Sequence, residues 1–210
     1  TKMSHLHFVT NAESARRVRQ LGEDPRYIYN VGSPGIDNIK RLKLLDRSEL
    51  EQRLDFKFKN KNLLITFHPV TLDNQISSKQ FHELLEALGG LGQEVGLIFT
   101  KPNADTGGRV IINMIDEFVS AHPNARAYVS LGQLVYLSTI KQVDAVVGNS
   151  SSGIIEAPSL KVPTINIGDR QKGRIRAESV IDVPCRKEDI LDALRKALYD
   201  EHFRRQVQQI

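Results

Sequence analysis

A turn of small polar residues is the feature of this 210-residue sequence that most directly suggests chemistry. Residues 148–153 read Gly-Asn-Ser-Ser-Ser-Gly and follow the apolar run 145–147. Small residues let a phosphate approach the backbone, and hydroxyls and amides at a helix N-terminus can donate hydrogen bonds to it. An ordinary serine N-cap would need only one hydroxyl. Three hydroxyls between two glycines therefore favour a phosphate-binding turn that uses Ser150 and Ser151.

Three further side chains are candidates for the same site. Glu156 lies four residues after Ser152, on one face of the expected helix, where a carboxylate can accept both hydroxyls of a ribose. His68 follows a strongly apolar run, and an imidazole there can donate to a diphosphate or transfer a proton. Arg170 can pair with phosphate. Each also has an ordinary structural interpretation: a carboxylate near a helix start, a turn-capping histidine and a solvated loop arginine.

Other common ligand motifs are missing from the sequence. Neither the Walker A spacing nor Gly-x-Gly-x-x-Gly occurs, which argues against a P-loop NTPase or a dinucleotide dehydrogenase. No His, Cys, Asp or Glu grouping has metal-ligand spacing, so we predict no metal and no cofactor. The remaining five histidines lack the context of His68, and we expect them to be structural or exposed: His5, His7, His82, His122 and His202.

The elements that would position these residues alternate along the chain. Short apolar runs predict strands at 7–10, 27–31, 63–67, 96–100, 127–130, 145–148 and 164–167. Amphipathic stretches predict helices at roughly 12–18, 35–44, 75–89, 108–120, 132–141, 151–158 and 187–199. The charged region 41–60 is predicted to be a helix and a connection. This alternation predicts a Rossmann-like α/β domain over 1–210, with a parallel sheet flanked by helices.

The expected strand ends gather the candidate residues. In open α/β sheets, ligands bind beyond the carboxyl ends of the strands. Polar or small residues follow five successive expected strands, at 68–69, 101–103, 131–132, 148–153 and 168–170. This convergence indicates a ligand site more strongly than any single motif does.

Composition limits the class of protein. A net charge of +4 and a pI of about 9.2 would suit nucleic acid, phosphate or an anionic membrane. The basic clusters are short, however, and only 6% of residues are aromatic, so we expect neither nucleic acid nor membrane as a partner. The longest apolar runs are too short to cross a bilayer.

Cellular location is predicted from the cysteine content and the start of the chain. Cys185 is the only cysteine, so no internal disulfide can form, and we expect a reducing cytoplasm. The sequence shows no basic stretch followed by an apolar one, so we expect no secretion. The chain begins at Thr1 without an initiator Met, which favours a fragment or a processed product.

These residues, in this order, resemble the UDP-N-acetylglucosamine 2-epimerase family. The matching stretches are 4–10 followed by Glu13, then 30–37 (Asn-Val-Gly-Ser-Pro-Gly-Ile-Asp), 66–69, 102–105, 148–156 and 163–170. They span about residues 3–200. The Gly-Asn-Ser-Ser-Ser-Gly turn is more similar to the hydrolysing branch, because the non-hydrolysing branch has Asp-Ser-Gly-Gly there. Hydrolysing members yield N-acetylmannosamine and UDP for sialic-acid-type sugars.

The resemblance implies a fold, partners and residue roles. The family has the two-domain glycosyltransferase-B architecture, and this chain resembles its C-terminal, UDP-binding half. The implied partners are UDP-N-acetylglucosamine or UDP and the N-terminal half, which carries most acid/base carboxylates; we also expect a homo-oligomer. The implied roles are His68 at the diphosphate with Asn103 nearby, the backbone at Leu131 on uracil, Ser150 and Ser151 on phosphate, Glu156 on ribose, and Arg170 at the pyrophosphate or its loop. His68 is the one candidate for direct catalysis.

Two other functions fit the same residues. A glycosyltransferase of the same fold would share the serine turn and the ribose carboxylate. A non-catalytic module, either a nucleotide sensor or a nucleic-acid-binding domain, would share the fold. Release of UDP without an acceptor separates the epimerase from the transferase. Binding of UDP without turnover would favour the sensor, and salt-sensitive oligonucleotide binding the nucleic-acid module.

Overall fold

The computed structural model describes residues 1–70, 74–103 and 106–210, and the chain forms two compact units, Thr1–Leu42 and Lys43–Ile210. We predicted one domain over 1–210. The division follows from strand pairing, because β1 (His7–Val9) and β2 (Ile28–Asn30) pair with each other in a sheet of their own. Six further strands form the sheet of the second unit.

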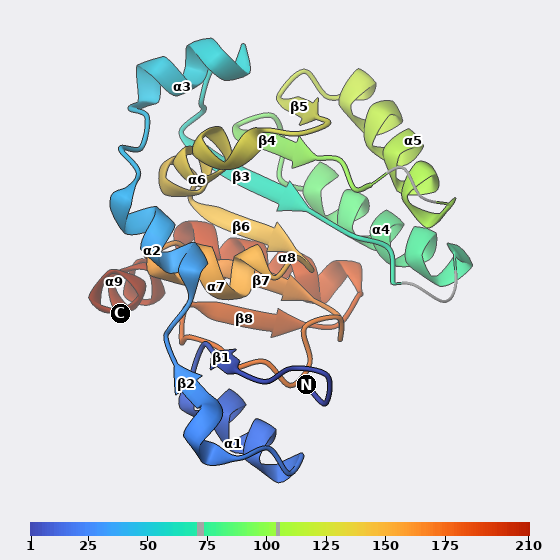
Figure 1. The fold of residues 1–210 in the computed structure, drawn as a ribbon. Helices are drawn as coiled ribbons and strands as arrows, with labels where there is room; N and C mark the ends of the chain where they lie inside the picture. The colour runs from blue at the N-terminus through green and yellow to red at the C-terminus, as the bar shows by residue number, and fades with distance from the viewer. Residues whose placement is uncertain (71–73, 104–105) are drawn as a thin grey trace. The chain divides into compact units, whose positions relative to one another are not determined.

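The second unit is built on a parallel sheet (Figure 1). All its neighbouring strands pair in parallel, in the order β5-β4-β3-β6-β7-β8. Counted from β3, this is the doubly wound order 3-2-1-4-5-6 of Rossmann folds. The predicted α/β class with a parallel sheet flanked by helices is therefore confirmed. The strands are β3 (Lys61–Thr66), β4 (Val95–Thr100), β5 (Ala125–Tyr128), β6 (Ala145–Gly148), β7 (Thr164–Ile167) and β8 (Val180–Val183).

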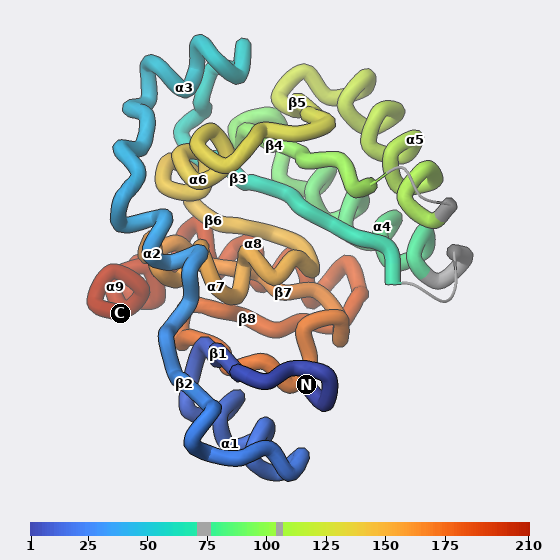
Figure 2. Tube along the Cα trace, viewed as in Figure 1, coloured from blue at the N-terminus to red at the C-terminus, as the bar shows by residue number. Residues whose placement is uncertain are grey.

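Helices cover both faces of this sheet (Figures 1 and 2). One face carries α4 (Asn74–Gly89), α5 (Thr106–Ala121) and α8 (Lys187–Tyr199). The other carries α3 (Arg47–Leu54), α6 (Gly132–Gln142) and α7 (Ser152–Ser159). The last helix, α9 (Glu201–Gln209), packs on α8. Among the described ranges, no helix has the length and apolar content needed to cross a membrane.

The core explains why β3 is a nearly continuous apolar run. Leu63, Ile65 and Phe67 join the main cluster under α4, α5 and α8, and each is at most 2% exposed. Leu64 is buried on the opposite face, because successive side chains of a strand alternate. A central strand with helices on both sides has no polar face. The helical spacing predicted in α4 is confirmed by its buried side chains, Phe81, Leu84, Leu85 and Leu88.

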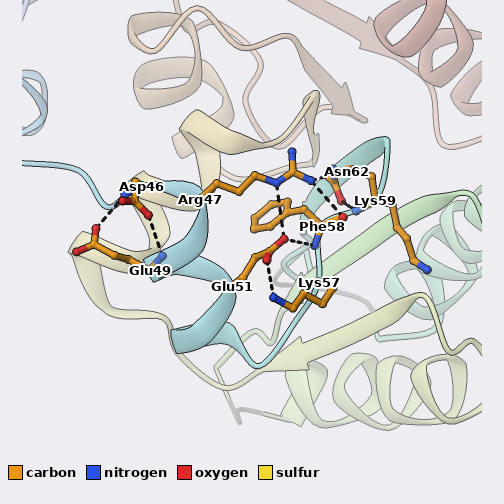
Figure 3. Close-up of polar contacts among 8 residues, drawn as sticks. All are labelled: Asp46, Arg47, Glu49, Glu51, Lys57, Phe58, Lys59 and Asn62. Atoms are coloured by element: carbon orange, nitrogen blue, oxygen red, sulfur yellow. Dashed lines mark hydrogen bonds and ion pairs between the residues drawn. The ribbon is translucent and has the colours of Figure 1, made fainter.

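The charged region 41–60 contains α3, as predicted for part of it (Figure 3). Asp46 accepts a hydrogen bond from the Glu49 backbone N–H at 2.9 Å, and the Glu49 side chain accepts one from the Asp46 N–H at 3.0 Å. This capping box satisfies two backbone donors at the helix start. Leu50 and Leu54 are buried beneath the charged surface. The helix ends at Asp55, which takes a left-handed conformation.

Several elements differ from the predicted ones. Strand β8 and helix α9 were not predicted, and β5 covers 125–128 rather than 127–130. β8 is a four-residue edge strand with half-buried and exposed side chains, so it lacks an apolar run. α9 buries only Phe203 and Val207, which leaves a weak apolar pattern.

The first unit is a small β-α-β structure. After β1 come α1 (Ala12–Gln20), a short 3₁₀ turn (Pro25–Tyr27), β2 and α2 (Pro34–Arg41). Helix α1 begins at Asn11, whose side chain accepts a hydrogen bond from the Ser14 N–H at 2.8 Å. These elements agree with the strands and helices predicted at 7–10, 12–18, 27–31 and 35–44.

The two-stranded sheet of this unit has one covered and one bare face. His7 and Val9 are buried, and α1 packs against both strands. On the other face, Phe8 is 63% and Tyr29 is 44% exposed. The two rings lie side by side, with their centroids 5.5 Å apart. Parallel sheets in folded proteins are normally covered on both faces, so this sheet lacks a layer.

Tyr128 connects the end of β5 to the end of α3. Its hydroxyl donates to the Leu54 carbonyl at 2.6 Å. Burial, the largest cause, raises the pKa of Tyr128 from 10.0 to about 12, and the negative charge of Asp55 adds to the rise. The folded chain therefore holds this proton to a higher pH than the unfolded chain does.

We predict that Tyr128 makes stability fall at high pH. The unfolded chain loses the proton first, so the contribution is complete below pH 10 and disappears as the pH rises through about 12. The loss in free energy of unfolding is at most about 3 kcal/mol. Urea unfolding of the wild type and Tyr128→Phe between pH 9 and 12 measures it. If the free energy of unfolding falls equally steeply with pH in both proteins, Tyr128 is not the group responsible.

Candidate functional site

The carboxyl ends of the strands lie level along one edge of the sheet. Thr66 is in register with Thr100 on β4 and with Gly148 on β6, and Gly148 is in register with Asn166 on β7. The chain winds outward in opposite directions from β3 and from β6. The edge between these two strands is therefore the switch point, where doubly wound sheets bind their ligands.

Gly148 sets how closely β6 approaches β3 at this point. Its φ of +133° lies in a region that glycine alone adopts readily. A Cβ added there would overlap the backbone carbonyl of Thr66. The missing side chain lets the next residue, Asn149, donate its N–H to the Thr66 carbonyl at 3.2 Å.

Asn149 joins three of the strand ends. Its side chain exchanges two hydrogen bonds with the backbone of His68, at 2.7 and 2.8 Å. Its carbonyl accepts from Arg170 Nη1 at 3.0 Å and from Gln171 Nε2 at 2.8 Å. The structure thus brings His68 and Arg170, both predicted site residues, to the serine turn.

The serine turn keeps hydrogen-bonding groups available. Ser151 stands at the N-cap of α7 but makes no side-chain capping bond. The Ser150 hydroxyl accepts a long bond of 3.4 Å from the Ser152 N–H. In the described part of the chain, the amide N–H groups of Ser150 and Ser151 donate to no protein atom. An anion is the natural partner for amides and hydroxyls at a helix start.

Glu156 has a buried carboxylate oxygen that also lacks a partner. Its Oε2 is inaccessible to solvent and makes no hydrogen bond with the described residues. Tyr136 lies close by: burial raises the pKa of its phenol, and the negative charge of Glu156 raises it further. The ordinary interpretation, a solvated surface carboxylate, does not fit a buried oxygen.

Asn103 and Leu131 lie at the same edge of the sheet as this cluster, but beyond other strands. Asn103 is exposed just beyond β4, and the rest of its predicted stretch, 104–105, lies outside the described residues. Leu131 precedes α6 beyond β5, two strands away from β3. Their predicted roles stay predictions.

A hollow of about 720 Å³ opens beside the turn, beyond the ends of β7 and β8. Asn149, Arg170 and Arg176 are among the residues that line it. A larger hollow of about 860 Å³ lies at the opposite, amino-terminal edge of the sheet, where Asp144 and Lys161 line it. We place the site at the carboxyl edge, because the unpartnered donors and the buried carboxylate are there.

The remaining titratable groups have structural surroundings. His7 interacts with Glu23 at 3.1 Å, and His122 stacks on Phe118. Burial, the largest cause, raises the pKa of the Cys185 thiol, which disfavours a reactive thiolate. Within the described ranges, no three His, Cys, Asp or Glu side chains gather closely enough to hold a metal ion.

Sequence reasoning missed three residues of this cluster: Asn149, Tyr136 and Gln171. Asn149 lies inside the predicted phosphate turn, but it has no hydroxyl, and the prediction was based on hydroxyl groups. Tyr136 lies within the helix predicted at 132–141, but no spacing in the sequence marked it as a site residue. Gln171 is only 3% exposed, although it sits in a polar loop.

The strand order and the switch-point edge place this chain in the class of Rossmann-like α/β proteins. Within that class, residues 1–210 match the family model described as UDP-N-acetylglucosamine 2-epimerase. The chain belongs to this family.

Relatives with known names agree with this assignment. The chain is 43% identical over 203 residues to the polysialic acid biosynthesis protein P7 of Escherichia coli, covering 97% of this chain and 51% of that protein. It is 42% identical over 183 residues to the GDP/UDP-N,N'-diacetylbacillosamine 2-epimerase (hydrolyzing) of Campylobacter jejuni, covering 87% and 47%. It is 32% identical over 197 residues to the UDP-N-acetylglucosamine 2-epimerase of Neisseria meningitidis, covering 94% and 51%. The chain thus spans about half the length of these relatives.

Solved structures share the fold. The S. aureus MnaA–UDP co-structure matches with a TM-score of 0.75 at 17% identity, over 97% of this chain and 53% of that one. The Methanocaldococcus jannaschii UDP-GlcNAc 2-epimerase in complex with UDP-GlcNAc and UDP matches with a TM-score of 0.72 at 16% identity, over 94% and 55%. At this identity, the two matches support the fold alone.

We predict that Gly148→Ala destabilises the second unit by about 3 kcal/mol or more, because it adds backbone strain and a clash with Thr66. Gly92→Ala is the matched control: Gly92 also has a positive φ, but its added Cβ would meet nothing within 4 Å. That control should cost only about 1–2 kcal/mol. Urea unfolding measures both, and equal losses would show that the Thr66 contact has no part in stability.

Proposed function

We propose that this chain is the UDP-binding half of a hydrolysing UDP-N-acetylglucosamine 2-epimerase. The observation that carries the proposal is the arrangement at the switch point. Ser150 and Ser151 have free amides and Glu156 has a buried oxygen without a partner. A phosphate on the turn and a ribose on the carboxylate would satisfy both kinds of group at once.

The relatives support the branch and the ligand. The Campylobacter jejuni relative is named as a hydrolysing 2-epimerase, and the Neisseria meningitidis relative as a UDP-N-acetylglucosamine 2-epimerase. The S. aureus and Methanocaldococcus structures of the same fold contain UDP. The E. coli relative is named for polysialic acid biosynthesis, which agrees with a product used for sialic-acid-type sugars.

A second half of the same enzyme is the partner we infer. The chain covers about half of its relatives, 47% to 51% of those named above. In the first unit, Phe8 and Tyr29 leave an aromatic face of a two-stranded parallel sheet uncovered. Such a sheet needs further strands and a covering layer to be stable. The other half would supply both.

The reaction divides between the two halves. A base removes the proton from C2 of the sugar, the C1–O bond breaks, and its electron pair leaves with the diphosphate of UDP. Water then adds across the C1–C2 double bond: hydroxide joins C1, and a proton returns to C2 on the opposite face. Donors at the turn, with His68 and Arg170, would stabilise the charge that grows on the leaving diphosphate.

The test of this function uses the full-length enzyme and UDP-N-acetylglucosamine without any acceptor. We expect release of UDP and free N-acetylmannosamine in equal amounts. The chain 1–210 alone should bind UDP in calorimetry and release none from the sugar nucleotide, because the base lies in the other half. Absence of UDP release by the full-length enzyme would refute hydrolysing activity on UDP-N-acetylglucosamine.

The same assay separates the alternatives. Formation of UDP-N-acetylmannosamine without UDP release identifies the non-hydrolysing branch. If the enzyme releases UDP only when a sugar acceptor is added, it is a glycosyltransferase. Turnover of UDP-N,N'-diacetylbacillosamine alone, the sugar in the name of the Campylobacter jejuni relative, would keep the reaction class and change the substrate. Turnover of UDP-N-acetylglucosamine by chain 1–210 alone would refute the division between halves.

We predict that Glu156→Gln weakens UDP binding by about 1.5–3 kcal/mol, the contribution of hydrogen bonds to a charged acceptor. Binding of an analogue that lacks both ribose hydroxyls should hardly change. Calorimetry with both ligands measures the difference. Glu117→Gln, at an exposed position on α5, is the control and should leave both affinities as they are. Equal losses for the two ligands in Glu156→Gln would show that Glu156 does not contact the ribose.

A further inference from the structure

Asn149 holds the backbone of His68 on both sides of its Cα atom. The Asn149 Oδ1 accepts from the His68 N–H at 2.7 Å, and the Asn149 Nδ2 donates to the His68 carbonyl at 2.8 Å. The two residues are 81 positions apart in the sequence. Because a peptide unit is planar, fixing the N–H on one side and the C=O on the other fixes the direction of the His68 Cα–Cβ bond, from which the imidazole extends.

We propose that Asn149 is a positioning residue that aims the His68 imidazole at the diphosphate. This inference rests on the proposed function, in which His68 acts on the leaving group. An amide side chain fits the task because it offers one acceptor and one donor together. A carboxylate could accept from the His68 N–H but would set an oxygen against the His68 carbonyl.

Asn149 can serve as a fixed support because its own backbone is held in turn. It is 1% exposed, its N–H donates to Thr66, and its carbonyl accepts from Arg170 and Gln171. The peptide that follows is trans, so the Ser150 N–H points away from the side occupied by these two donors. One residue therefore sets the imidazole and the first amide of the phosphate turn relative to each other.

Asn62 provides a matched comparison within the same sheet (Figure 3). Its side chain makes the same reciprocal pair of bonds with the backbone of Lys59, at 2.8 and 2.9 Å, and it is 2% exposed. It stands at the amino-terminal end of β3, whereas His68 follows the carboxyl end. Loss of Asn62 should therefore reproduce the structural cost of losing such a pair without disturbing the site.

The experiment is a double-mutant cycle in the full-length enzyme. We compare Asn149→Ala, His68→Ala, the double variant and Asn62→Ala for kcat of UDP release, UDP affinity and melting temperature. Asn149→Ala should lower kcat by about 100-fold, the effect of misplacing one catalytic donor. UDP affinity should fall by about tenfold or less. In the His68→Ala background, loss of Asn149 should lower kcat little further, because both changes remove the same interaction. Asn62→Ala should lower the melting temperature similarly and keep kcat.

Each outcome decides between defined alternatives. If folded Asn149→Ala keeps kcat within about threefold of Asn62→Ala, or if the two losses multiply in the double variant, the positioning role is wrong while the proposed function stands. If the wild-type enzyme releases no UDP, the proposed function fails first. Should Asn149→Ala not fold, Asn149→Asp keeps the shape and the acceptor and loses the donor. It should still lower kcat, and a normal kcat in that folded variant would overturn the inference.

Discussion

The close approach of β6 to β3 at Gly148 is the constraint on which the site depends. These two strands form the middle of the sheet, where the winding changes direction. With no side chain at position 148, the backbone can lie against the Thr66 carbonyl, and Asn149 then reaches the His68 peptide. A larger residue would separate the two strand ends and with them the histidine and the serine turn. The geometry of the site therefore depends on the lack of a side chain at Gly148.

Much of the fold could be predicted from local patterns. Buried central strands are apolar runs, and α4 and α5 repeat apolar residues at helical spacing, so their types were predicted correctly. The edge strand β8 was missed because its side chains are half-buried or exposed and form no fully apolar run. The helix in region 41–60 was predicted without its start, although Asp46 and Glu49 form a capping-box pair in the sequence. The division at Leu42 was not readable, because strand pairing between distant segments decides it.

The residue types of the site could be predicted, but the hydrogen bonds that connect these residues could not. Serines and a histidine after apolar runs suggested their positions, since parallel strands end at one edge. The bonds that join His68, Asn149 and Arg170 cross 21 to 81 positions of sequence, and no local pattern records them. Tyr136 was missed for the same reason, because its relation to Glu156 exists only after α6 and α7 pack together.

Most of the groups at this edge of the sheet favour a negatively charged ligand. Amides, hydroxyls, an arginine and a histidine suit an accumulating negative charge, which is what a departing diphosphate presents. Glu156 has a buried, unpartnered oxygen, and it lies in α7, just after the turn that would hold the nucleotide. Removal of a C2 proton requires a base at the far end of the substrate. In the proposed reaction, this edge stabilises the leaving group, and the base comes from the second half. The exposed aromatic face of Phe8 and Tyr29 is the surface that, under the function proposed above, a second half would cover.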